Sequence, residues 1–273
     1  IGITGTHGSI TMTKMKTSIG LVSISYMGTQ FSTLMIDLFS SLQQDYWAEC
    51  QSWIKGVDSQ FTSDKIHFHF TADSGTQLLV LSGLACRYLE NGDWSWQLFF
   101  ENVFASKTAG IATYFRIKRL DIAIDEHGSS TRLTPRSVER YLTKGLFTSR
   151  ASRALFLNER KITSRCNTGL SCYIGRRTSK AYIFIYDKGL EQGIGAGNWY
   201  RTEIRLRDPF AGEMVNRIVS DKRLFGASVA EYLRQRMQFR SPTSTIKEIR
   251  RRPLVGWYGK YLDRVASCEL AYR

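Results

Sequence analysis

Three segments of the chain alternate apolar and polar residues with the two-residue period of a β-strand, and this pattern constrains the fold most. They span residues 119–125, 186–188 and 202–207. Because successive side chains of a strand project to opposite faces, the polar residues of each segment share one face of the predicted sheet. The sequence therefore predicts an α+β fold whose central, largely antiparallel sheet carries the functional site, with flanking helices and a helical carboxyl-terminal portion.

Other strands and helices are predicted from apolar spacing and turn residues. Additional strands are expected at residues 18–26, 65–70 and 77–82, and the strand that contains 119–125 is expected to begin at 114. Helices are expected over 32–54, 94–105 and 135–144, as two helices within 210–239 broken near Gly226, and as a small helical tail within 246–272. Thr134 before Pro135 marks a helix start, because the hydroxyl can cap and proline at the first turn loses no needed hydrogen bond.

The chain divides into three expected regions. Residues 1–17 are predicted to be a loose amino-terminal extension, 18–240 a catalytic domain and 241–273 a basic carboxyl-terminal tail. Within the second region, glycines at 193–197 supply the flexible connection that an antiparallel hairpin between the 182–187 and 199–207 strands needs.

The charge of the chain favours a polyanionic partner. Its 273 residues include 38 Lys and Arg against 24 Asp and Glu, which gives a net charge of +14 and a pI near 9.7. Eight basic residues and one acid, Glu159, lie within 146–180, and Lys247, Arg250, Arg251 and Arg252 form a second cluster. A solvated face remains the alternative for a run of like charges. Nucleic acid is the leading partner, and the first cluster, just before the 182–187 strand, is predicted to track DNA.

Cysteine content and hydropathy bear on the compartment. The five cysteines are an odd number at irregular spacings, which predicts neither a disulfide framework nor a four-ligand zinc site. No stretch approaches the ~20 apolar residues needed to cross a bilayer, and the first eleven residues lack the plan of a secretory signal. We therefore expect no membrane partner and a location in the reducing cytoplasm of a bacterial host.

The acidic residues on the predicted sheet face are candidate metal ligands. Asp121, Asp125 and Glu203 offer hard oxygen donors, which prefer Mg²⁺ or Mn²⁺. A fully extended strand holds Asp121 and Asp125 roughly 13 Å apart, so one ion joins both only if the chain bends. The alternatives are an exposed sheet face with Asp121 paired to Arg119, and a surface ladder of Glu203 with its arginine neighbours.

Tyr186 is the candidate nucleophile. A phenol with a pKa near ~10 is a poor nucleophile at neutral pH, and adjacent cations or a metal ion help it to ionise. Lys188 follows two residues later on the same predicted face, and Arg176, Arg177 and Lys180 precede the strand. A buried core tyrosine is the alternative.

His67 and His69 flank one bulky apolar residue in a predicted strand. This arrangement is found in the metal site of one class of DNA-nicking enzymes, which also use tyrosine. Two histidines at this spacing are a weak pattern, and a sheet face with two polar histidines is the favoured interpretation.

Five segments together resemble the replication initiation factor family of rolling-circle plasmids and filamentous phages, which also includes relaxases of some conjugative elements. They occur in the family's order across roughly residues 77–215, and the order makes the resemblance specific. The segments are Leu81-Ser82-Gly83 with Cys86, and residues 119–125, 173–179, 185–192 and 201–207.

The resemblance implies a function and roles for particular residues. Members nick one DNA strand at an origin, become joined to the 5′-phosphate through a tyrosine and leave a 3′-OH that primes replication. By this resemblance Tyr186 is the catalytic tyrosine, and Asp121, Asp125 and Glu203 are the acidic metal positions. Apart from the resemblance, Lys188 is expected to act with Tyr186 in catalysis and to hold phosphate, and the residues expected to bind DNA are Arg176, Arg177, Lys180, Arg201 and Arg205.

The expected partners are origin DNA, single-stranded or extruded, a second copy of the chain, and a host helicase and polymerase. A plasmid or phage initiator is the first interpretation, because the sequence shows no leading helix-turn-helix segment like that of conjugative relaxases. A conjugative relaxase and a DNA-binding regulator without catalysis are the alternatives.

Overall fold

A single antiparallel sheet of ten strands organises the part of the chain that the computed structural model describes. The described residues are 14–27, 48–50, 59–62, 66–70, 76–91, 95–109, 114–128, 133–160, 162, 167–221 and 224–270. The strand order is β2-β3-β4-β5-β1-β6-β11-β10-β9-β8, and each neighbouring pair is antiparallel. The predicted α+β fold with a central antiparallel sheet is thereby confirmed.

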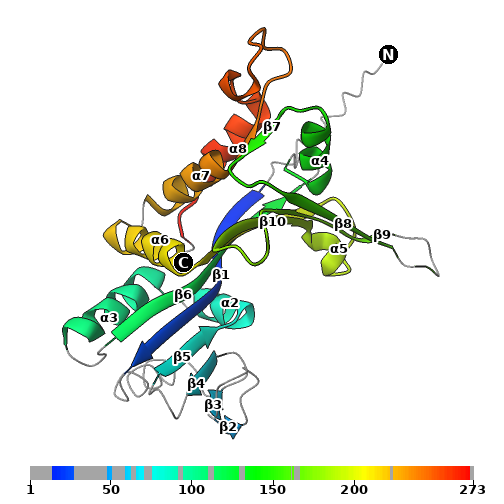
Figure 1. The fold of residues 1–273 in the computed structure, drawn as a ribbon. Coiled ribbons are helices and arrows are strands. Elements are labelled where there is room, and N and C mark those ends of the chain that lie inside the picture. The colour runs from blue at the N-terminus through cyan, green and yellow to red at the C-terminus, as the bar shows by residue number, and fades with distance from the viewer. Residues whose placement is uncertain are drawn as a thin grey trace, which may run out of the picture.

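The strands differ greatly in length, and the two longest lie together at the centre of the sheet (Figure 1). Those two are β1 (Lys14–Met27) and β6 (Tyr114–His127). On one side follow β5 (Thr76–Leu81), β4 (Ile66–Phe70), β3 (Ser59–Thr62) and β2 (Ala48–Cys50). On the other side follow β11 (Trp199–Arg207), β10 (Ala181–Asp187), β9 (Asn167–Ile174) and β8 (Ala154–Arg160). A second, two-stranded sheet pairs β7 (Phe147–Ser149) with β12 (Met237–Phe239).

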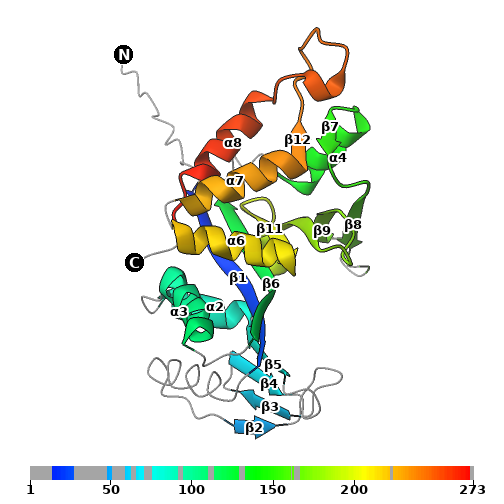
Figure 2. The ribbon, with the colours of Figure 1, turned by 60° about the vertical axis from the view of Figure 1, so that its left-hand side comes forward.

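Helices cover one face of the large sheet. Figures 1 and 2 show α3, α6, α7 and α8 stacked along that face. The helices are α2 (Gly83–Asn91), α3 (Trp96–Thr108), α4 (Pro135–Thr143), the short α5 (Lys188–Glu191), α6 (Pro209–Ser220), α7 (Phe225–Arg236), the 3₁₀ turn η2 (Ile249–Arg251) and α8 (Gly256–Ala266). Within the described residues, no helix is long and apolar enough to span a bilayer.

The core lies between the helices and the apolar face of the central strands. Leu120, Ile122 and Ile124 of β6 are buried there, and each recurs two residues after the last, as a strand requires. The other face of β6 carries Asp121 and Asp125, which are also buried. This second face holds the candidate site.

A β-bulge at Gly20 breaks the register between β1 and β6. Ile19 pairs with Ile122 and Leu21 with Asp121, so Gly20 is the extra residue. The amide of Ile19 donates to Oε1 of Glu90 at 2.9 Å, and the Trp96 indole donates to the same oxygen at 3.0 Å. A side chain from α2 therefore satisfies a backbone donor that the bulge removes from the strand ladder.

Most predicted elements are present. The helix start at Thr134 is confirmed: the Thr134 hydroxyl accepts from the Ser137 amide at 3.1 Å, and Pro135 begins α4. β6 runs two residues beyond Asp125, the last residue of the predicted alternating segment. The predicted hairpin is formed by β10 and β11, with the unexpected helix α5 in its connection.

Two predictions near the amino terminus need correction. β1 begins at Lys14, so the last four residues of the supposed extension, 1–17, belong to the central strand, and residues 1–13 lie outside the described part. The helix predicted over 32–54 is wrong at Ala48–Cys50, which form the edge strand β2. The rest of that range lies outside the described residues.

The carboxyl-terminal region is not a tail appended to the domain. Tyr258, Leu262 and Val265 of α8 are buried in the main core. The two helices predicted within 210–239 are present: α6 ends at Ser220 and α7 begins at Phe225, so the break lies just before Gly226. A Cβ at Gly226 would come within 3.0 Å of three backbone carbonyls at the end of α8 and just beyond it. Glycine is therefore needed where α7 packs against α8.

Candidate active site

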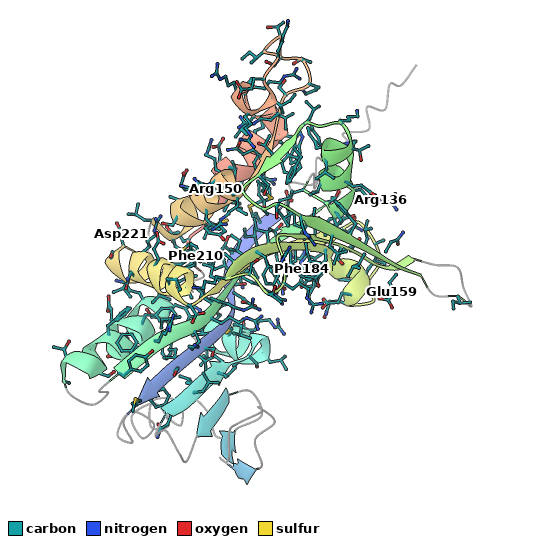
Figure 3. The ribbon with its side chains drawn as sticks, in the orientation of Figure 1. Arg136, Arg150, Glu159, Phe184, Phe210 and Asp221 are labelled. Atoms are coloured by element: carbon teal, nitrogen blue, oxygen red, sulfur yellow. The ribbon has the colours of Figure 1, made fainter. Side chains whose placement is uncertain are left out.

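The candidate site lies on the sheet face opposite the helix layer, where three neighbouring strands bring their polar residues into register. On β6 and β11, Asp125 pairs with Arg201, Ala123 with Glu203 and Asp121 with Arg205. On β10, Tyr186, Phe184 and Tyr182 lie beside those same three β11 residues. The face therefore alternates carboxylates, guanidinium groups and aromatic rings, and Figure 3 labels Phe184 on it.

Tyr186 lies next to one of the predicted acids. Its hydroxyl donates to Oε1 of Glu203 at 2.8 Å, and its ring stacks on Phe184 with centroids 4.5 Å apart. The side chain is part of this ladder and is only 7% exposed. Burial, followed by the negative charge of Glu203, raises the pKa of the Tyr186 phenol above its usual value, whereas Arg201 acts to lower it. The resting phenol is therefore protonated at neutral pH, with its proton directed at a carboxylate.

Glu203 and Asp121 meet at one guanidinium group. Arg205 Nη2 lies 2.6 Å from Oε2 of Glu203, and Arg205 Nε lies 3.4 Å from Oδ2 of Asp121. Arg119 also binds Asp121, with its Nε 2.8 Å from Oδ1. Burial raises the pKa of Asp121 above the usual carboxyl value, and these two arginines oppose the shift. Two of the three predicted metal-site acids thus converge on a position held by a cation.

Asp125 has a separate partner. Arg201 binds it through two parallel hydrogen bonds of 2.7 and 2.6 Å, and the Trp199 indole donates to Oδ1 at 2.7 Å. β6 continues without a break from Asp121 to Asp125, so the bend that a shared ion would need is not found. Among the residues that the structure describes, no three His, Cys, Asp or Glu side chains are grouped closely enough to hold a metal ion.

Lys188 lies close to Tyr186, as their spacing predicted. Its Nζ is 5.7 Å from the centroid of the Tyr186 ring and forms an ion pair with Glu191. Asp187 fixes this arrangement, because Oδ1 caps α5 at the Leu190 amide and Oδ2 accepts from the Gly197 amide at 2.9 Å. The side chain of Lys188 is thus held over the tyrosine ring by a capped turn.

The predicted DNA-binding residues fall into two groups. Arg176, Arg177 and Lys180 are exposed and lie on the turn between β9 and β10. Arg177 also lies over the Tyr173 ring, 5.4 Å from its centroid. Arg201 and Arg205, in contrast, are bound to Asp125 and Glu203. Only the turn group presents guanidinium and ammonium groups directly to solvent.

The ion pairs that the sequence offered as alternatives to a metal site are present, and they belong to the same cluster as Tyr186. The Arg119–Asp121 pair and the Glu203–Arg205 pair both exist, but they are part of a half-buried network that also contains the tyrosine. His67 and His69 belong to β4, where they pair with Val80 and Leu78 of β5, and their side chains lie outside the described part.

Sequence reasoning assigned no role to three residues of the site: Trp199, Asp187 and Glu191. Asp187 had a detectable signal, because an aspartate directly before a short polar helical turn is a common cap. Trp199 had none, since its contact with Asp125 depends on the pairing of β6 with β11.

Comparison with known proteins identifies the fold and the relatives of the chain. A rolling-circle replication initiator protein from Geobacillus stearothermophilus has the same fold, with a TM-score of 0.80 at 22% sequence identity, covering 95% of this chain and 100% of that one. A Bacillus subtilis (strain 168) protein described as a DNA relaxase, NicK, is 26% identical over 218 residues, or 74% of this chain. The match spans 59% of that relative's length.

The match to the family itself is extensive. The model of the family described as replication initiation factor matches residues 115–273, which is more than half of the chain and includes β6, β10 and β11. The chain belongs to the replication initiation factor family.

Proposed function

We propose that this protein initiates rolling-circle replication by nicking one DNA strand at an origin and later rejoining it, with Tyr186 as the nucleophile. One observation carries the proposal: the Tyr186 hydroxyl donates to Glu203 at 2.8 Å on the face shared with Asp121, Arg205 and Lys188. Phenol, carboxylate and cations are the groups needed to transfer a phosphoryl group to tyrosine.

The reaction exchanges one phosphate ester for another. The Tyr186 oxygen forms a bond to phosphorus, the bond from phosphorus to the 3′-oxygen breaks, and its electron pair leaves with that oxygen. Glu203 takes the phenolic proton, and the leaving oxygen gains a proton from water to become the 3′-OH. Because one phosphodiester replaces another, the bond energy is retained in the 5′-phosphotyrosine and the strand can be rejoined without ATP.

Asp121 and Glu203, the carboxylates that meet at Arg205, are the proposed ligands of Mg²⁺ or Mn²⁺, which would take the place that the Arg205 guanidinium holds. Oε1 of Glu203 faces the phenol and Oε2 faces the cation position, so Glu203 can contact both at once. Asp125 is bound by Arg201 on an unbent strand, so it is not proposed as a ligand of the same ion. When bound, the ion would neutralise negative charge that develops on the phosphoryl oxygens.

The same face offers support for an unpaired strand. Tyr173 and Phe184 stack with centroids 4.2 Å apart, and aromatic rings of this kind bind bases by stacking. The exposed turn with Arg176, Arg177 and Lys180 directly precedes Ala181, the first residue of β10. Ala181 is five residues, or about 17 Å, from Tyr186 along an extended strand. These cations would hold phosphates and position the strand without reading its sequence.

Replacement of Tyr186 by phenylalanine tests the assignment. We expect Tyr186→Phe to bind a single-stranded origin oligonucleotide as the parent does but to give no cleavage and no nucleotide adduct by mass spectrometry with Mn²⁺ present. Tyr182→Phe is the matched control, because Tyr182 lies on the same strand and face and accepts a hydrogen bond from Arg205. Cleavage by Tyr186→Phe at the parent rate would refute the assignment, and a parent chain that binds but never cleaves would indicate a DNA-binding regulator.

A conjugative relaxase is the second candidate, favoured by the similarity to NicK. The chemistry at tyrosine would be identical, so only the DNA substrate distinguishes the two functions. Cleavage confined to a transfer origin would favour the relaxase. Action as a dimer, together with a host helicase and polymerase, is likewise part of the proposal.

A further inference from the structure

We infer that a second DNA site, specific for the phosphate backbone of a duplex, lies in a groove between α7 and the small two-stranded sheet. The groove consists of an open hollow of about 580 Å³ and a neighbouring one of about 390 Å³. Both are lined in part by Thr148, Ser149 and Arg250, so they adjoin each other. We call this feature the arginine groove.

Two basic clusters far apart in the sequence supply its cations. Arg150 and Arg153 come from the cluster that precedes the tyrosine strand, Arg250 comes from the carboxyl-terminal cluster, and Arg234 of α7 joins them. Pairing of β7 with β12 makes this possible, because it brings residues 147–149 beside 237–239. Figure 3 shows Arg150 beside α7, away from Phe184 on the catalytic face.

The groove arginines are available to a ligand. All four are exposed, and within the described part of the chain no carboxylate forms an ion pair with Arg150, Arg153 or Arg250. The neighbours of Arg250 differ, since Arg251 pairs with Glu248 at 2.8 Å and Arg252 Nε donates to the Ile246 carbonyl at 2.6 Å.

One acid reduces the positive charge of the groove only in part. Glu231 also lines the larger hollow, where its carboxylate accepts a hydrogen bond from Gln235 at 2.9 Å and lies 3.8 Å from Arg234. Three arginines face this one carboxylate in the larger hollow, and the smaller hollow has two arginines and no acid among its lining residues. The groove therefore carries a net positive charge.

The chemistry of the lining favours a duplex backbone over an unpaired strand. Hydroxyl and amide groups of Thr148, Ser149, Gln235 and Gln238 accompany the arginines. No aromatic ring lines the larger hollow, and Phe147, which lines the smaller one, packs against Phe239. Proteins hold duplex phosphates with such groups, whereas unpaired bases require rings on which to stack. Those rings are on the Tyr186 face. This inference rests on the proposed function: the cut strand lies on the Tyr186 face, and the adjoining duplex lies in the arginine groove.

A paired set of variants tests the inference in the full chain. Arg150→Ala with Arg250→Ala removes two groove cations, and Arg251→Ala with Lys260→Ala removes two exposed cations outside it. Binding of a blunt duplex oligonucleotide is measured over a range of salt concentrations, and cleavage of a short single-stranded origin oligonucleotide is measured in parallel. Each phosphate contact adds about 0.9 to the slope of log K against log salt.

We expect the groove variant to lower that slope by about two units and to cleave the single strand at the parent rate, while the control keeps the parent slope. An unchanged slope in the groove variant, or an equal fall in the control, would overturn the inference. So would a fall in single-strand affinity as large as that for duplex. If the parent does not cleave but the groove variant alone loses duplex affinity, the duplex site stands and the Tyr186 proposal fails. Arg250→Glu provides a second measurement, with a larger expected loss of duplex affinity.

Discussion

The two faces of the central strand β6 are buried to a similar degree by opposite kinds of interaction. Leu120 and Ile122, on the helix side, have no exposed surface, and Asp121 and Asp125, on the other side, are 4% and 6% exposed. Apolar contacts bury the first pair, whereas arginine partners make the burial of the second pair possible.

The two kinds of burial respond differently to substitution. An apolar face tolerates changes that conserve volume, because its contacts are many and individually weak. An ion pair fails when one partner is removed, because the other is left charged in a poorly hydrated place. A face built from ion pairs therefore has side chains in fixed positions, which the proposed reaction at a single phosphate needs.

Asp125→Ala should have the largest effect on stability. It leaves the Arg201 guanidinium buried without its carboxylate, and we expect a loss of about 3–5 kcal/mol in the free energy of unfolding. Urea denaturation measures this loss. The double variant Asp125→Leu with Arg201→Leu is the control and should lose less than the single one, because no uncompensated charge remains. An additive loss in the double variant would show that the pair does not behave as a unit.

Ile122→Val should have a smaller effect on the opposite face. It removes one buried methylene group, so we expect a loss of about 0.5–1.5 kcal/mol, again from urea denaturation. A loss as large as that of Asp125→Ala would remove the distinction between the two faces.

Glu90→Gln should have the smallest effect, and one that depends on pH. Burial raises the pKa of Glu90 above 4.5, so the carboxyl group favours folding most below that pH, and this contribution falls as pH rises through the folded-state pKa. Glutamine keeps an oxygen for the Ile19 and Trp96 donors but does not ionise. The variant should therefore gain stability relative to the parent between pH 4 and 8 in thermal unfolding, and a constant difference would contradict the shift.

The sequence predicts which residues share the face of the candidate site better than it predicts the contacts between their side chains. Alternation in the strands suffices to place Tyr186, Glu203 and Asp121 on one sheet face, because the period of a strand fixes which side chains share a face. It does not predict that Arg205 joins Glu203 to Asp121, because the register between strands is set by tertiary packing.

The same limit explains the missed features of the fold. Convergence of Arg150 and Arg250 requires the pairing of β7 with β12, two strands of three residues each, too short to give a periodic signal. The sequence predicts a helix within 246–272, but the basic charge of the 241–273 region favoured a tail and gave no indication that Tyr258, Leu262 and Val265 of α8 lie in the core.

The close packing at Gly226 restricts which residues can occupy that position. Any larger residue there would force α8 away from α7, and α8 carries Arg264, whose partner Glu126 adjoins Asp125 on β6. Gly259, on α8 itself, has open space where a side chain would project. In a selection from randomised codons, position 259 should accept many residues while position 226 returns glycine.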